Sequence, residues 1–90
     1  MIGMHLHYIE GEEDFLWRIA STPGAYGSRN GTDWYCTTPN GLFGDISKHE
    51  VIENEDGTVT VSPSILVTSG MNHEEPSWHG YLIRGVWKEC

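Results

Sequence analysis

Histidine and cysteine are the residues of this chain whose types and spacing could support metal or catalytic chemistry. His5 and His7 lie two positions apart near the N-terminus. Alternate residues of a β-strand project from the same face, so this pair could present two imidazole groups to one metal ion. The spacing supplies no third ligand, and surface histidines on a strand are the competing interpretation.

A second set of candidate metal ligands consists of Cys36, His49, His79 and Cys90. These are ligand types of tetrahedral zinc, but they show no CxxC or similar local spacing. Two cysteines without such spacing indicate free thiols, and a terminal thiol such as Cys90 is usually inert. We therefore predict no cofactor and no resident metal. A residual zinc-binding structural module built on these four residues is the alternative.

Covalent catalysis would need a nucleophile, a base and an orienting group, and Cys36, His79 and Asp33 offer one of each type. The chain has no GxSxG motif, no Gly-rich phosphate loop, no HExxH and no EF-hand loop. We therefore do not predict an enzyme. An enzyme would require a pocket that gathers His79 with an acid or a thiol.

Charge restricts the classes of partner. Thirteen acidic and five basic residues give a net charge of −8, which repels phosphate backbones and anionic lipid headgroups. We expect neither nucleic-acid binding nor membrane binding. Acidic runs at residues 11–14, 50–56 and 74–75 suggest a second alternative, a DNA mimic that inhibits a nucleic-acid-binding protein. The competing interpretation is that these runs are solvated turns and the wet face of a hairpin.

Length and aromatic content indicate one small core. Ninety residues are too few for a second domain, so residues 1–90 are expected to form a single domain. No apolar run approaches a membrane span, and the N-terminus lacks the features of a signal peptide, so we expect a cytoplasmic protein. The four tryptophans are expected to be largely structural, because aromatic side chains bury the most area. They are Trp17, Trp34, Trp78 and Trp87.

The elements that must position these residues are predicted to be short strands. Residues 4–10 alternate with period two and indicate a strand. The apolar run at residues 15–20 is also assigned to a strand, because Pro23 and Gly24 follow closely. Residues 21–32 are expected to form the longest loop, and residues 33–38 a further strand ending at a Pro-Asn-Gly turn.

Two hairpins are predicted in the second half. A two-residue turn at Asp56-Gly57 would place Ile52 opposite Val61 and Asn54 opposite Val59, with apolar and polar residues on separate faces. A three-residue loop would pair Ile52 with Thr60 and break that separation, so we favour the two-residue turn.

Pro63 is expected to end or kink the strand that follows this turn, and residues 65–67 to continue as a buried run. A second hairpin turns at Arg84-Gly85, with Leu82 opposite Trp87, Ile83 opposite Val86, and a positive φ at Gly85. The predicted fold is therefore all-β or mainly β, a single-domain antiparallel sheet or roll of about six or seven short strands.

Two stretches of sequence resemble a family. The segment TVTVSPSILV at residues 58–67 and the segment WHGYLIRGVW at residues 78–87 resemble small uncharacterised bacteriophage and prophage proteins. The pattern of that family is an "SPSI" strand followed by a "CH-x-[FY]-[IL]-x-x-G" hairpin, and its members include proteins of phages that infect actinobacteria. In zinc-ribbon-like members, a Cys-His pair opens the last hairpin. Trp78 replaces that cysteine here and only His79 remains, so the resemblance implies a phage origin and a lost zinc site.

From size, origin and motifs we predict a small phage-encoded accessory protein. It would bind and modulate or inhibit a host or phage protein in the host cytoplasm. The sequence is also compatible with a homodimer. Contact residues are expected in aromatic-containing loops at residues 25–34 and 70–78. The candidates are Tyr26, Arg29, Trp34, Met71, His73 and Trp78.

Overall fold

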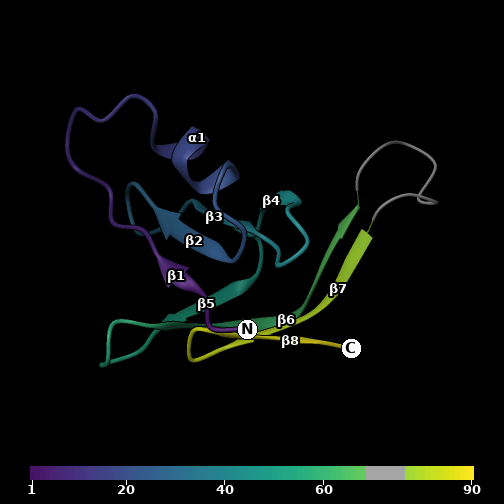
Figure 1. Ribbon diagram of the computed structural model, residues 1–90. Helices are drawn as coiled ribbons and strands as arrows, with labels where there is room; N and C mark the ends of the chain where they lie inside the picture. Colours follow the sequence, from purple (N-terminus) through teal and green to yellow (C-terminus); the bar gives the residue numbers. More distant parts are fainter. Residues whose placement is uncertain (69–76) are drawn as a thin grey trace.

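The fold consists of two four-stranded sheets and one short helix. A computed structural model describes residues 1–68 and 77–90, and the ribbon in Figure 1 shows the sheets as separate layers. The predicted mainly β class is confirmed. The first sheet has the order β1 (Met4–His5), β2 (Ala25–Ser28), β3 (Trp34–Thr37) and β4 (Phe43–Asp45). The second has the order β5 (Glu50–Glu53), β6 (Val59–Thr68), β7 (Ser77–Ile83) and β8 (Val86–Glu89).

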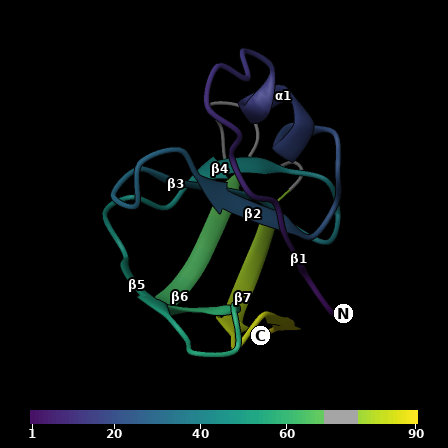
Figure 2. The ribbon, with the colours of Figure 1, turned by 90° about the vertical axis from the view of Figure 1, so that its left-hand side faces the viewer.

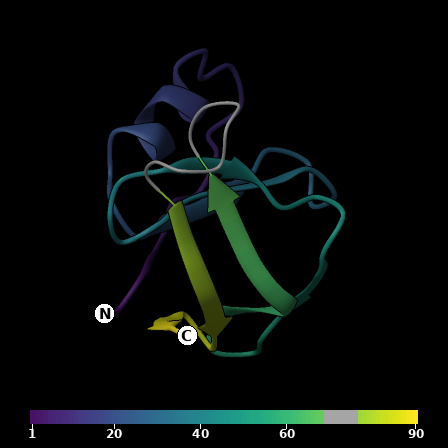
Figure 3. The ribbon, with the colours of Figure 1, turned by 90° about the vertical axis from the view of Figure 1, so that its right-hand side faces the viewer.

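Neighbouring strands are antiparallel except β1 and β2, which pair in parallel. In Figures 2 and 3, β6 and β7 run crosswise to β2 and β3, and their far ends approach β4. At that end the Asn40 side-chain amide donates a hydrogen bond of 3.2 Å to the Ser77 carbonyl. No helix in the described part of the chain is both long and apolar enough to cross a membrane.

Hydrophobic side chains form two cores, one on each face of the first sheet. The larger core lies between the sheets and includes the buried rings of Tyr26, Trp34, Trp78 and Trp87. The smaller core lies under the helix α1 (Phe15–Ala20), on the face of the first sheet that points away from the second (Figure 1). Its buried members are Leu6, Phe15, Ile19 and Ala25.

The prediction of a strand at residues 15–20 was wrong, because this segment forms α1. Phe15 and Ile19 are four residues apart, so a helix places both on one face, where both are fully buried. The Thr37 hydroxyl donates to the Ile19 carbonyl at 2.6 Å and ties the last turn to β3. The tryptophan of α1, Trp17, is 73% exposed, which corrects the expectation that all four tryptophans are structural.

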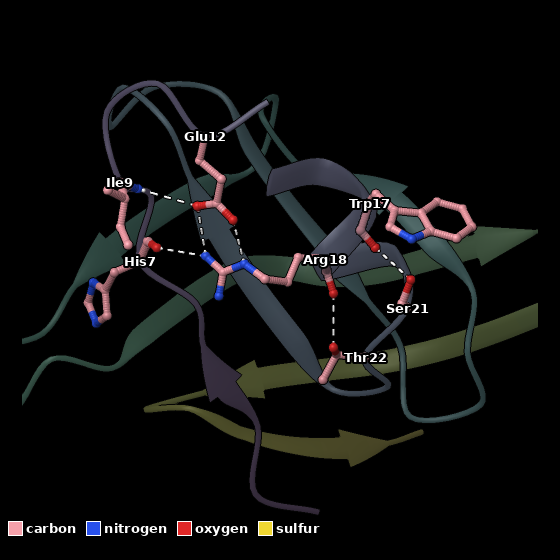
Figure 4. Close-up of polar contacts among 7 residues, drawn as sticks. All are labelled: His7, Ile9, Glu12, Trp17, Arg18, Ser21 and Thr22. Atoms are coloured by element: carbon pink, nitrogen blue, oxygen red, sulfur yellow. Dashed lines mark hydrogen bonds and ion pairs between the residues drawn. The ribbon is translucent and has the colours of Figure 1, made fainter. Parts of the chain in front are cut away.

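The chain before α1 is held by an ion pair from the helix (Figure 4). The Arg18 guanidinium donates to both carboxylate oxygens of Glu12, at 2.7 and 3.0 Å, and to the His7 carbonyl at 2.9 Å. A bidentate pair of this kind is geometrically specific. These bonds fix residues 7–12 over the helix, although the predicted strand at residues 4–10 is limited to Met4–His5.

Glu12→Gln should lower the melting temperature at pH 7, and this effect should shrink as the pH falls below the ordinary pKa of the carboxyl group. The hydrogen bonds from Arg18 lower the pKa of Glu12 below its ordinary value of 4.5. The ionised pair therefore stabilises the fold above that value, and the stabilisation is lost as the pH falls through the lowered folded-state pKa. Circular-dichroism melts across this pH range measure the effect. The adjacent exposed Glu13→Gln is the matched control, and an equal, pH-independent shift in both variants would contradict the prediction.

The β5–β6 hairpin is present where it was predicted, but its register differs. Ile52 lies opposite Thr60, and Val51 lies opposite Val61. Val51 is half-buried between the sheets, whereas Ile52 is 47% exposed on the outer side. Pairing Val51 with Val61 keeps an apolar cross-strand pair facing the core. The observed register therefore also directs an apolar residue of β5 toward the core, but this residue is Val51 and not Ile52.

A three-residue loop sets this register. The Asn54 amide donates to the Thr58 carbonyl at 2.8 Å, and the Gly57 amide donates to the Asn54 carbonyl at 3.1 Å. Gly57 has a φ of +86°, as the left-handed residue after a type I turn requires. Glu53, and not Asn54, therefore lies opposite Val59.

The second half of the chain follows the remaining predictions closely. The ladder between β6 and β7 shifts register between Val61 and Ile65, at the predicted kink around Pro63, whose preceding peptide bond is cis. The run at residues 65–67 is only partly buried, because Leu66 is 63% exposed while its two neighbours face the core.

The hairpin that joins β7 to β8 has the predicted register. Leu82 pairs with Trp87 and Ile83 pairs with Val86. The φ of Gly85 is +76°, as predicted, and that of Arg84 is +45°, so both turn residues are left-handed, as in a type I′ turn.

Candidate functional site

A hollow of about 340 Å³ opens where both sheets meet at one end of the molecule. The chain around β1, the turn between β2 and β3, and the tip of the β5–β6 hairpin form its walls. Its lining includes two imidazoles, a guanidinium, a carboxylate and two aromatic rings, from His5, His7, Arg29, Glu53, Tyr8 and Trp34. This volume is within the range of small-ligand pockets.

Stacked rings form one wall of the hollow. The His5 and His7 rings have centroids 4.1 Å apart and are stacked. His5 also lies 5.1 Å from the Tyr26 ring and 5.8 Å from the Trp34 ring. The predicted pair of imidazoles on one face is therefore present, although these rings face each other within an aromatic stack.

One hydrogen bond determines the tautomer of His5. Its Nδ1 atom lies 2.7 Å from the Gly57 carbonyl oxygen. A carbonyl oxygen can only accept, so Nδ1 carries the proton. In the neutral ring, Nε2 is then left with a lone pair, which makes it an acceptor or a base.

The turn between β2 and β3 is held by its own side chains. The Ser28 hydroxyl accepts bonds from the amides of Asn30 and Gly31, at 3.2 and 2.8 Å. The Asn30 side-chain oxygen accepts from the Asp33 amide at 2.8 Å, and the indole of Trp34 donates to the Gly31 carbonyl at 3.3 Å. These bonds order the turn that carries the exposed Arg29 at the rim of the hollow.

The hairpin side of the hollow supplies Glu53 and Asn54. The alternation of β5 directs Val51 and Glu53 to the side of the first sheet, and Glu50 and Ile52 to the opposite face. The Asn54 amide nitrogen donates to the hydroxyls of Thr58 and Thr60, each at 3.1 Å, so this side chain lies on the side of β6 opposite its core-facing valines.

Of the four predicted zinc ligands, Cys36 lies apart from the other three, which are near Ser64 and the end of β8. Cys36 is fully buried in the core between the sheets. The Nε2 atoms of His49 and His79 lie 3.1 and 3.0 Å from the carbonyl and the hydroxyl oxygen of Ser64, respectively. Cys90 is exposed and its backbone amide donates to the His79 carbonyl. Among residues 1–68 and 77–90, no three His, Cys, Asp or Glu side chains form a group that could hold a metal ion.

Burial makes the Cys36 thiol a poor nucleophile. Desolvation, with a smaller contribution from the charge of Asp45, raises the pKa of Cys36 to about 12. A thiol reacts through its thiolate, and at neutral pH almost none of this group is ionised. The environment of Cys36 is therefore that of a core side chain.

The predicted partner contacts differ in their accessibility. Tyr26, Trp34 and Trp78 are buried. Arg29 is exposed, and it meets Trp34 at the hollow, while the Tyr26 ring lies behind the His5 ring. The other two candidates, Met71 and His73, lie outside the described residues. The loop predicted at residues 21–32 contains β2, so only its last part forms the turn at the hollow.

Sequence reasoning missed Glu53 and Tyr8 as lining residues of the hollow. The predicted register placed Glu53 opposite Thr60, on the wet face of the hairpin. A register with Val51 as the inward residue would have placed Glu53 on the same side as the core.

The comparisons with known proteins found no matching family model, no matching curated protein and no matching solved structure.

A second exposed feature is the outer face of the second sheet. Four large apolar side chains are exposed there, on alternating positions of three strands: Ile52, Leu66, Tyr81 and Ile83. We refer to these four residues as the outer face.

Proposed function

We propose that this protein binds a partner protein through the hollow and thereby modulates or inhibits that partner. The observation that supports this proposal is the concave site itself. Ordered walls, aromatic rings and charged groups of both signs meet there, and such a combination is typical of recognition sites. The resemblance to phage proteins supports a phage-encoded accessory protein that acts on a host or phage protein in the host cytoplasm.

A zinc-binding module and an enzyme each have less support. A zinc module would require Cys36 to leave the core in order to meet the histidines, and burial of that thiol disfavours the thiolate that zinc needs. An enzyme built on Cys36 would have the same buried, protonated nucleophile.

Affinity capture with matched variants tests the proposal. Wild-type protein, Glu53→Trp and Glu50→Trp are immobilised and exposed to host lysate. The first variant fills the hollow, and the second places the same side chain on the opposite face of the same strand. We expect a host protein to be retained by the wild type and by Glu50→Trp, and to be lost with Glu53→Trp.

Two results would contradict the proposal. Recovery of no protein above background by the wild type would argue against a binding function in the host. Loss of the captured protein with Glu50→Trp but not with Glu53→Trp would move the binding surface to the outer face.

A further inference from the structure

We propose that the hollow receives a lysine or arginine side chain of the partner. This inference rests on the proposed function and specifies the chemistry of its site. It is argued from the flat aromatic surfaces, from the hydrogen-bonding groups that remain free, and from the charge around the site.

Aromatic surfaces suit the alkyl stem and charged head of such a side chain. Tyr8 and the His5–His7 stack line the hollow, and Trp34, which is 4% exposed, contributes only a small part of its ring. A cation over an aromatic face is attracted by the quadrupole of the ring. The methylene groups of lysine or arginine can pack against the same surfaces.

Two side chains of the hollow present acceptors to a cation, while Arg29 is the charged donor in the lining. The Nδ1–H group of His5 is donated to Gly57, which leaves the Nε2 lone pair. Glu53 adds a carboxylate, which can only accept when ionised. An ammonium or guanidinium group is all donor and complements this set.

Charge favours the same class of ligand. The protein has a net charge of −8, and the tip of the β5–β6 hairpin carries Glu53, Glu55 and Asp56. Of the ion pairs among the described residues, Arg84–Asp56 uses one of these acids, and Glu53 is in none. The one opposing cation in the lining is Arg29, which is exposed at the rim and can turn toward water. An anion would have to enter against this field, with Arg29 as its main attraction.

NMR titration with capped amino acids tests the proposal directly. The probe is N-acetyl-lysine N-methylamide, and the control is the norleucine analogue, which has the same stem without the ammonium group. From typical ligand efficiencies we expect a Kd of about 1 mM for the lysine probe. Binding should shift the indole N–H signal of Trp34 and the ring signals of His5, and the norleucine analogue should bind at least about fivefold more weakly.

Two glutamates of β5 supply a matched pair of variants. Glu53→Gln removes the carboxylate in the hollow, and Glu50→Gln removes the same charge from the opposite face. We expect Glu53→Gln to weaken lysine binding by about fivefold and Glu50→Gln by less than about twofold. Arg29→Gln should strengthen binding by roughly two- to fivefold, because it removes the opposing charge.

Three results would overturn the cation assignment. They are equal binding of lysine and norleucine probes, equal effects of the two glutamate variants, or shifts at Trp34 and His5 caused by inorganic phosphate and not by lysine. If one of these results occurs while Glu53→Trp still abolishes capture of a host protein, the proposed function is kept and only the assignment of a cationic ligand is rejected. If capture shows no dependence on the hollow, the proposed function falls whatever the titration shows.

Discussion

Replacing Trp87 by alanine is expected to abolish the cooperative melting transition and leave most of the protein unfolded or insoluble. Truncating a buried tryptophan typically costs about 3–5 kcal/mol, and a whole domain is stabilised by roughly 5–15 kcal/mol. A chain of ninety residues has a small core, so the loss of one such anchor is a large share of its stability.

Trp87 connects three parts of the fold. Its ring is 3% exposed and meets the Trp78 ring edge to face at a centroid distance of 5.3 Å. Its indole N–H donates to the Gly24 carbonyl at 2.9 Å, and its backbone amide donates to the Met1 carbonyl at 2.8 Å. The alanine variant therefore loses core packing and a bond between the sheets, and it leaves the Gly24 carbonyl without that donor.

Thermal melts followed by near-ultraviolet circular dichroism measure this effect. Trp17→Ala removes the same side chain from an exposed position and should leave the melting temperature nearly unchanged. Trp87→Phe keeps a ring but loses the indole N–H, and it should give an intermediate melting temperature. A normal transition in Trp87→Ala would show that the ring is not an anchor of the core.

Gly27→Ala is expected to destabilise the protein by about 3 kcal/mol, the upper end of the range for overpacking a well-packed core. Gly27 is in β2, where the chain after β1 and the helix α1 both approach the strand closely. A methyl group on Gly27 would overlap the Leu6 carbonyl oxygen and lie 2.9 Å from the Phe15 ring. The backbone cannot yield there without separating β1 from β2 and the helix from the first sheet.

Gly44→Ala in β4 is the matched control. The three atoms nearest to its added methyl group would all belong to the Val67 side chain, the first at 2.9 Å, so a cost of about 1 kcal/mol is expected. Urea denaturation of both variants gives the free energies of unfolding. Similar values for the two variants would show that the contact between residues 6 and 27 relaxes easily.

The second hairpin and the mainly β class could be predicted because their determinants are local. The Arg84-Gly85 turn sets its own register, and the apolar alternation on both sides agrees with that register, so one solution satisfies both. The kink at Pro63 is local for the same reason, because proline cannot donate to a ladder wherever the strand lies.

The register of the first hairpin could not be predicted from local sequence. Val51 and Ile52 are neighbours with similar apolarity, so either could face the core, and each choice implies a different turn. The packing of the first sheet against Val51 decides between them. Because that choice also directs Glu53 toward the hollow, the composition of the candidate site depends on it.

The helix and the hollow depend on contacts between segments that are far apart in the sequence. The run at residues 15–20 is too short for its periodicity to separate helix from strand, and the surface offered by Ala25 and Gly27 selects the helix that buries Phe15 and Ile19. The mainly β class, the second hairpin and the placement of His5 and His7 on one side of the chain could be predicted from the sequence. It could not show that residues 5, 29, 34 and 53 meet, because these residues come from segments far apart in the sequence, and long-range packing alone brings such segments together.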